Sequence, residues 1–295
     1  MNFKSQIVWL TALSLLLLAG CATLDEKQRD WIFQPGDRSW GSSAEFSDGM
    51  QHLWIPFDST VTGKPVKLHA LFHANDGTPD GHLTKTRRGA GPVMLYLHGA
   101  RWNVAGSSAR IRRMQALGFS VLAIDYRGFG KTSAELPSEE MAYEDARAAW
   151  TWLAAEFPDR ERYIFGHSLG GAIAIDLAAQ VTDESGTIVE GTFSSIADVF
   201  SSLKWGWLPI GGFITQPFDA ASKVDRVGSP LLVVHGSNDS TIKPELGRKL
   251  YEAAKHPKAF VLVEGGSHFS TNAVGQMQYQ DALARLFGPA LQSNR

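Results

Sequence analysis

The fold of this chain is constrained most strongly by a stretch of five residues, Gly166-His167-Ser168-Leu169-Gly170. The residues before it, 163–165, are apolar and typical of a strand, and residues 169–178 have the apolar spacing of a helix. The stretch therefore fits the pattern Gly-x-Ser-x-Gly at a sharp strand-to-helix turn, where glycines leave room on either side of the serine. Such a turn lifts the Ser168 hydroxyl clear of the sheet, above a helix N-terminus. Glycine and serine are common, so the flanking elements are what distinguish the pattern from a chance match.

Strand-like and helix-like segments alternate along the rest of the chain. Alternating polarity over 52–57 and 66–73 predicts antiparallel edge strands. Helices on both faces of a mostly parallel sheet follow from this alternation, so the predicted fold class is α/β. Apolar runs predict further strands over 92–97, 120–124, 187–192, 230–234 and 259–263, and helical spacing predicts helices over 110–117, 138–157, 244–254 and 276–287.

Composition and charge exclude several classes of function. At 44% hydrophobic and 20% charged residues, the 295-residue chain is globular in composition. The net charge is −2, from 28 basic and 30 acidic residues, which argues against nucleic acid as a partner. The one cysteine, Cys21, allows no internal disulfide, and the histidines lack the spacing of metal ligands. We therefore expect no metal and no cofactor.

The first 21 residues look like an export signal. A basic residue, Lys4, precedes an apolar run from Ile7 to Leu18, which is too short to span a bilayer comfortably. The run ends in Leu18-Ala19-Gly20-Cys21, which resembles the lipobox of bacterial lipoproteins. That resemblance implies a signal peptide over 1–20 and a Cys21 that carries lipid, palmitate included. An ordinary signal peptide and an uncleaved anchor remain as alternatives.

The same resemblance implies where the protein resides. Position 22 is alanine rather than aspartate, which in such lipoproteins indicates sorting to the outer membrane, facing the periplasm. The lipid would make the membrane a partner through the N-terminus. Polar residues with Pro35-Gly36 and Gly41-Ser42-Ser43 predict a tether over 21–45, followed by the folded domain over 46–290.

Two residues downstream supply what a serine nucleophile needs. A serine hydroxyl is a poor nucleophile at pH 7 unless a base takes its proton. His268 follows the last predicted strand and Asp239 follows the strand before it, and functional groups gather at the carboxyl ends of parallel strands. We expect His268 to move the proton and Asp239 to orient the imidazole. Glu190, at the end of another strand, is the alternative acid.

The chain as a whole resembles a known superfamily on six groups of residues. The order Ser168, Asp239, His268 is that of an α/β-hydrolase triad. Over about residues 30–290 the chain resembles the Bem46-like and ABHD-type (serine-aminopeptidase-like) members of the α/β-hydrolase superfamily. The groups are His98-Gly99, Asp125-Tyr126-Arg127-Gly128-Phe129-Gly130, 166–171, Gly191-Thr192-Phe193-Ser194-Ser195, His235-Gly236 with Asp239, and Gly266 with His268.

The resemblance implies an oxyanion hole and a cap. The backbone N–H groups of Ala100 and Leu169 would hold the oxyanion. Relatives often carry small polar residues and glycines after the His-Gly pair, whereas Arg101 and Trp102 stand here and are expected to narrow the pocket. A short cap insertion is expected over 195–227. Its Trp205 and Trp207 are interpreted either as part of an acyl-side wall, in reach of lipid, or as core residues.

The expected activity is that of a serine hydrolase cleaving carboxylic esters through an acyl-enzyme intermediate, with a small acyl compound as substrate. A thioesterase and a serine peptidase or aminopeptidase are the alternatives among enzymes. From another class, a non-catalytic envelope lipoprotein could use the same fold as a binding module.

Overall fold

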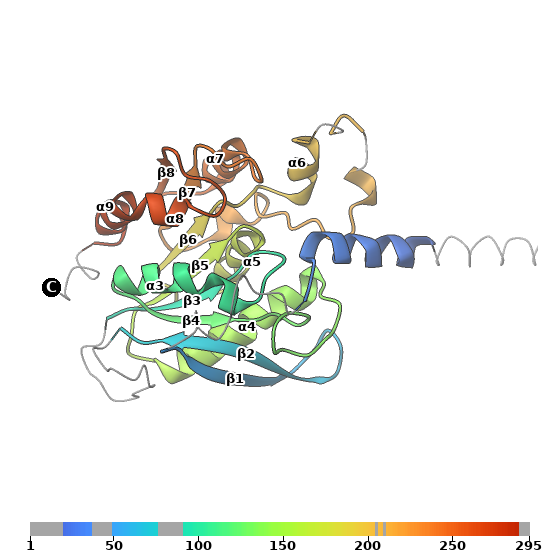
Figure 1. The fold of residues 1–295 in the computed structure, drawn as a ribbon, viewed down its shortest axis with the longest axis horizontal. Coiled ribbons are helices and arrows are strands. Elements are labelled where there is room, and N and C mark those ends of the chain that lie inside the picture. Colours follow the sequence, from blue (N-terminus) through green and yellow to red (C-terminus); the bar gives the residue numbers. More distant parts are fainter. Residues whose placement is uncertain (1–19, 37–48, 76–90, 204–205, 209–210, 289–295) are drawn as a thin grey trace, which may run out of the picture.

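The described part of the chain folds around one mixed sheet of eight strands (Figure 1). The computed structural model describes residues 20–36, 49–75, 91–203, 206–208 and 211–288. The strand order is β1-β2-β4-β3-β5-β6-β7-β8, antiparallel from β1 to β4 and parallel from there on. The strands are β1 (Gln51–Asp58), β2 (Pro65–His73), β3 (Val93–Leu97), β4 (Ser120–Ile124), β5 (Arg162–His167), β6 (Gly186–Glu190), β7 (Leu231–Gly236) and β8 (Lys258–Val263).

Helices cover both faces of this sheet, which confirms the predicted fold class. One core cluster packs α4, α5 and α7 against one face, and a second packs α3 and α9 against the other. Strands β3, β4 and β7 are buried along their whole length, which explains their apolar runs. The helices are α3 (Ser108–Ala116), α4 (Glu139–Glu156), α5 (Leu169–Ala178), α6 (Ile196–Ser201), α7 (Pro244–Ala253), α8 (Thr271–Val274) and α9 (Gln276–Phe287), with 3-10 turns η1 (Val104–Ser107), η2 (Gly211–Phe213) and η3 (Val224–Arg226).

Local sequence signals set several boundaries. Ser138 caps α4, because its side chain accepts a hydrogen bond from the Met141 N–H, as the sequence predicts. The strand predicted over 187–192 ends earlier, at Glu190, because Gly191 turns the chain with φ = 57°. The two strands predicted first are confirmed as the antiparallel pair β1 and β2, but of the two only β1 lies at an edge among the described strands, because β2 also pairs with β4.

The N-terminal segment differs from the prediction. Residues 20–33 form a helix, so the tether predicted over 21–45 is wrong for this part; residues 1–19 and 37–45 lie outside the described ranges. No glycine or proline interrupts 21–34, and an Asp25–Arg29 ion pair of 3.5 Å joins successive turns. Phe33 is fully buried, with its ring 5.6 Å from that of Phe218. None of the helices in the described ranges is long and apolar enough to cross a membrane.

Candidate active site

Ser168 lies on a tight turn between β5 and α5. Its backbone is held at φ = 56°, a conformation that costs a non-glycine residue about 1–3 kcal/mol. The chain tolerates this geometry because glycines flank it. A Cβ on Gly166 would overlap the Gly170 carbonyl, and one on Gly170 would overlap the Leu97 carbonyl. The turn therefore requires glycine at both positions.

Replacing Gly170 by alanine tests this requirement. The added methyl group would meet the backbone of β3, which cannot move without disturbing the sheet, so we expect a loss of about 3 kcal/mol in the free energy of unfolding. Gly228→Ala is the matched control, because the nearest atom to its Cβ would be 4.0 Å away. Denaturant unfolding of the two variants gives the comparison. Equal stability of the two would contradict this account of the turn.

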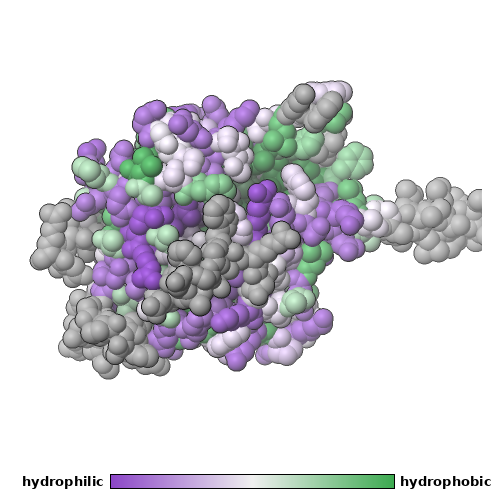
Figure 2. All heavy atoms as spheres, in the orientation of Figure 1, coloured by the Kyte–Doolittle hydropathy of each residue, from purple (hydrophilic) through white to green (hydrophobic). Residues whose placement is uncertain are grey.

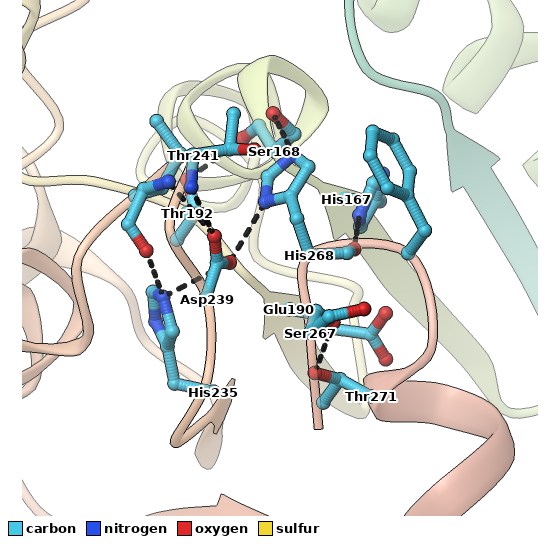
Figure 3. Close-up of polar contacts among 12 residues, drawn as sticks. His167, Ser168, Glu190, Thr192, His235, Asp239, Thr241, Ser267, His268 and Thr271 are labelled. Carbon is cyan, nitrogen blue, oxygen red and sulfur yellow. Dashed lines mark hydrogen bonds and ion pairs between the residues drawn. The ribbon is translucent and has the colours of Figure 1, made fainter. Parts of the chain in front are cut away.

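The structure brings the three predicted residues Ser168, His268 and Asp239 into one line (Figure 3). The Ser168 Oγ lies 3.0 Å from Nε2 of His268, and Nδ1 of the same ring lies 2.8 Å from Oδ2 of Asp239. His268 and Asp239 come from the loops that follow β8 and β7, at the carboxyl edge of the sheet. This geometry allows a proton to pass from the hydroxyl to an imidazole whose other nitrogen donates to a carboxylate.

The Asp239 carboxylate is held in its ionised form. Burial raises the pKa of Asp239, but hydrogen bonds from His235 and His268 and from the backbone of Ile242 outweigh burial and hold that pKa well below its usual range. Its other oxygen, Oδ1, accepts the N–H groups of Thr241 and Ile242, at 2.9 and 2.8 Å. Asp239 is therefore ionised at neutral pH and fixed in orientation.

The predicted oxyanion donors flank the serine from two elements. Leu169 is the first residue of α5, and Ala100 lies in the loop after β3; both line the same cavity as Ser168. This loop is held in the middle, since the N–H of Arg101 donates to the Phe33 carbonyl at 2.9 Å. Arg101 has φ = 83° there. The N-terminal helix therefore fixes the residue next to Ala100, a role that the sequence analysis missed although Trp31-Ile32-Phe33 is an apolar run.

A buried carboxylate holds the far end of the same loop. Oδ1 of Asp125 accepts the Val104 N–H at 2.6 Å, and Oδ2 lies 2.7 Å from Nδ1 of His69. His69 in turn contacts His52, with 2.8 Å between ring nitrogens. Asp125 therefore has a structural role, because it ties this loop to β2. The burial of His69, which is 3% exposed, was not predicted, because a strand pattern does not show which polar side chain finds a buried partner.

The Glu190 carboxylate binds residues other than His268. Its carboxylate accepts a hydrogen bond from Arg110 Nε at 2.9 Å and a second from the hydroxyl of Tyr279. In the described part of the chain the carboxylate that contacts His268 is that of Asp239. Arg110 also reaches the Phe269 carbonyl at 3.4 Å, so this buried ion pair supports the loop that carries His268.

The triad opens into a cavity of about 510 Å³. Arg101 and Trp102 both line it, as the sequence predicts. Among the described residues its lining includes three arginines and no carboxylate. Apolar side chains from the N-terminal helix, α5, α6 and neighbouring loops form another part of the wall, namely Ile32, Leu169, Phe193, Ile196, Val199 and Ile242.

The expected cap over 195–227 contributes to this wall through α6. Trp207 does not pack in a core, because it is 74% exposed, and Trp205 lies outside the described ranges. The core interpretation is therefore wrong for Trp207. Within the described part of the expected cap, the apolar residues that line the cavity are Ile196 and Val199, and Trp207 is not among the lining residues. No group of side chains with the geometry of a metal site occurs among the residues that the structure describes.

Phe33→Ala tests whether the N-terminal helix supports the loop after β3. Removing this buried ring should cost about 3–5 kcal/mol of unfolding free energy and let the Phe33 carbonyl move away from Arg101. We expect kcat for the ester hydrolysis that the sequence predicts to fall at least tenfold in the folded variant, with KM changed less. Phe72→Ala, at an equally buried ring remote from the cavity lining, is the control. Equal kcat in the two folded variants would argue against the contact.

Comparisons with known proteins relate the chain to hydrolases. The family described as serine aminopeptidase, S33, matches residues 90–214. The uncharacterised protein Rv2307c of Mycobacterium tuberculosis is 30% identical over 235 residues, 78% of this chain and 82% of its own length. The lysophosphatidylserine lipase ABHD12 of Danio rerio is 30% identical over 196 residues, 59% of this chain and 50% of its own length, so the chain matches about half of that relative.

A solved structure shows the same fold. The Pyrococcus furiosus esterase Pf2001 superimposes with a TM-score of 0.63 over 86% of this chain and 99% of its own, at 18% sequence identity. At that identity the likeness concerns the fold alone.

Proposed function

The chain is an ABHD-type member of the α/β-hydrolase superfamily, and from this premise we propose that it cleaves carboxylic esters through an acyl-enzyme intermediate. The observation that carries the proposal is the continuous hydrogen-bonded chain from Ser168 Oγ through His268 to Asp239. Ser168 and His268 face a cavity that has an apolar wall.

The reaction follows from the contacts. His268 Nε2 takes the proton of Ser168 as its Oγ attacks the ester carbonyl, and the Asp239 carboxylate stabilises the imidazolium that forms. The N–H groups of Ala100 and Leu169 hold the negative oxygen of the tetrahedral intermediate. His268 returns the proton to the leaving alcohol, which leaves an acyl ester on Ser168. Water, activated by the same imidazole, then releases the acid and restores the serine.

The test is hydrolysis by the purified full chain of 4-methylumbelliferyl esters from acetate to palmitate. Matched acyl thioesters and aminoacyl amides test the thioesterase and aminopeptidase alternatives. Ester turnover with little amide turnover is the expected result. An aminopeptidase holds a substrate ammonium group, and the described lining of the cavity offers arginines rather than a carboxylate for that purpose. Inertness toward all three series would favour the binding-module alternative.

The arginines favour a narrower second candidate, an ester that carries an anionic group. Arg101, Arg110 and Arg113 line the cavity, and Glu190 neutralises the second of them. A relative is named as a lysophosphatidylserine lipase, whose named substrate class is an anionic monoacyl lipid. We expect Arg101→Gln to raise KM for monoacyl glycerophosphoserine more than for neutral monoacylglycerol. Equal changes in the two KM values would remove this candidate.

Lipidation and location are part of the proposal. We propose that the chain is cleaved after residue 20 and anchored by lipid on Cys21 at the periplasmic face of the outer membrane. Cys21 is exposed and free at the start of the N-terminal helix, which is compatible with modification. Incorporation of labelled palmitate in a bacterial host, lost in Cys21→Ser, tests the anchor; labelling retained in that variant would place the lipid elsewhere.

A further inference from the structure

Large apolar side chains lie exposed at one end of the molecule. Figure 2 shows hydrophobic atoms gathered at the end where the N-terminal helix meets the segment after α6. The six residues, here called the apolar rim, are Leu24, Trp31, Leu203, Trp207, Leu208 and Phe213. Trp207 and Phe213 are 74% and 66% exposed. A cluster of exposed apolar side chains of this kind marks an interaction site, whereas single exposed apolar residues are common on protein surfaces.

Hydrogen bonds join the two halves of the rim into one surface. Gln28, on the N-terminal helix, donates to the Phe213 carbonyl at 2.6 Å and accepts the Thr215 N–H at 2.9 Å. Gln216 donates to Asp25 at 2.9 Å. Leu24 and Trp31 stand seven residues apart on the helix, so they share one face of it. The helix and the cap therefore present their apolar side chains together.

The rim adjoins the catalytic cavity. Trp31 belongs both to the rim and to the cavity lining. The rim residue Leu203 lies two residues after the end of α6, and Ile196 and Val199 of α6 line the same cavity. An acyl chain that leaves an apolar phase at the rim would thus meet apolar wall on its way to Ser168. A surface that served only solubility or protein contact would not need this continuity with the cavity.

The sequence indicates which partner covers the rim. Cys21, which we propose above carries the lipid anchor, is the second residue of the N-terminal helix. The helical residues from Cys21 to Phe33 rise about 20 Å, so the rim lies within about that distance of the lipid-bearing end of the helix. We propose that the apolar rim docks on the surface of a lipid bilayer, with the cavity opening toward the acyl chains.

Fluorescence quenching by brominated lipid tests the docking without relying on activity. The full chain is bound to phosphatidylethanolamine–phosphatidylglycerol vesicles containing dibrominated phosphatidylcholine. Trp207→Phe should reduce the quenched share of tryptophan emission, because it removes an indole that we place in lipid. Trp54→Phe is the matched control, since Trp54 is exposed on the edge strand β1. Unchanged quenching in Trp207→Phe, or an equal loss in the control, would overturn the docking.

A second measurement rests on the proposed function. Phe213→Ser should slow hydrolysis of an ester embedded in the vesicles at least tenfold and leave a water-soluble short ester unaffected. Equal rates on the embedded ester in variant and parent would overturn the rim's role. A chain inactive on both esters would refute the proposed function instead, while the quenching result would still decide the docking.

A second copy of the chain is the other possible occupant. Cross-linking of the vesicle-bound chain through exposed lysines such as Lys27 tests it. Dimers that disappear in Phe213→Ser would assign the rim to self-association and overturn the lipid assignment, and monomers in both would support it.

Discussion

Ser168→Ala will lower kcat for ester hydrolysis by about 10⁴-fold or more. The substitution removes the atom that attacks the carbonyl and leaves His268 and Asp239 without a proton donor to act on. Oxyanion donors and substrate binding remain, so a small residual rate is expected. The measurement is kcat on the best short ester, with the concentration of folded chain determined independently.

The folded state should survive this change. The Ser168 N–H donates to the Glu190 carbonyl and the Ser168 carbonyl accepts from Thr192, and alanine keeps both backbone contacts. Removing the hydroxyl alone should therefore leave the free energy of unfolding within about 1 kcal/mol of the parent. A variant that folds normally and keeps more than a hundredth of the parent kcat would show that another group is the nucleophile.

Asp239→Asn will lower kcat by about 10⁴-fold. An asparagine amide cannot balance the imidazolium that forms in the transition state, and it no longer selects the His268 tautomer with its proton on Nδ1. Because the pKa of Asp239 is held low, its protonation will not limit activity at mildly acidic pH in the parent enzyme. The pH profile of kcat/KM in parent and variant gives both quantities.

Glu190→Gln is the matched control for that prediction. It changes a buried carboxylate of the same sheet edge to an amide and leaves Arg110 without its ion-pair partner, which should cost about 3–5 kcal/mol of unfolding free energy. The kcat of the folded fraction should stay within about tenfold of the parent. A larger loss of kcat in Glu190→Gln than in Asp239→Asn would make Glu190 the catalytic acid.

The sequence predicted the catalytic residues better than it predicted the contacts that hold them in place. Glycine at 166 and 170 is required by backbone overlap, and Ser168, Asp239 and His268 each follow a strand, so local pattern and chain order were enough to place them together. Strand ends are visible in one sequence because buried parallel strands are continuous apolar runs.

The contacts that hold the loops of the site in place join residues far apart in the sequence, and no local pattern shows them. The Phe33 carbonyl meets Arg101 across 68 positions, and Asp125 meets His69 across 56. The polar composition of 22–30 resembles a linker as much as an amphipathic helix, and tertiary contacts such as the packing of Phe33 against Phe129 and Phe218 decide between them. Tertiary context therefore determined what the sequence analysis missed.

Labelling with a fluorophosphonate is the most direct test of the central claim, that Ser168 is an activated nucleophile. The full chain is treated with the reagent, digested and mapped by mass spectrometry. We expect one adduct, on Ser168, absent in Ser168→Ala and formed much more slowly in His268→Ala. A folded chain that gains no adduct, or gains it on another residue, would contradict the account.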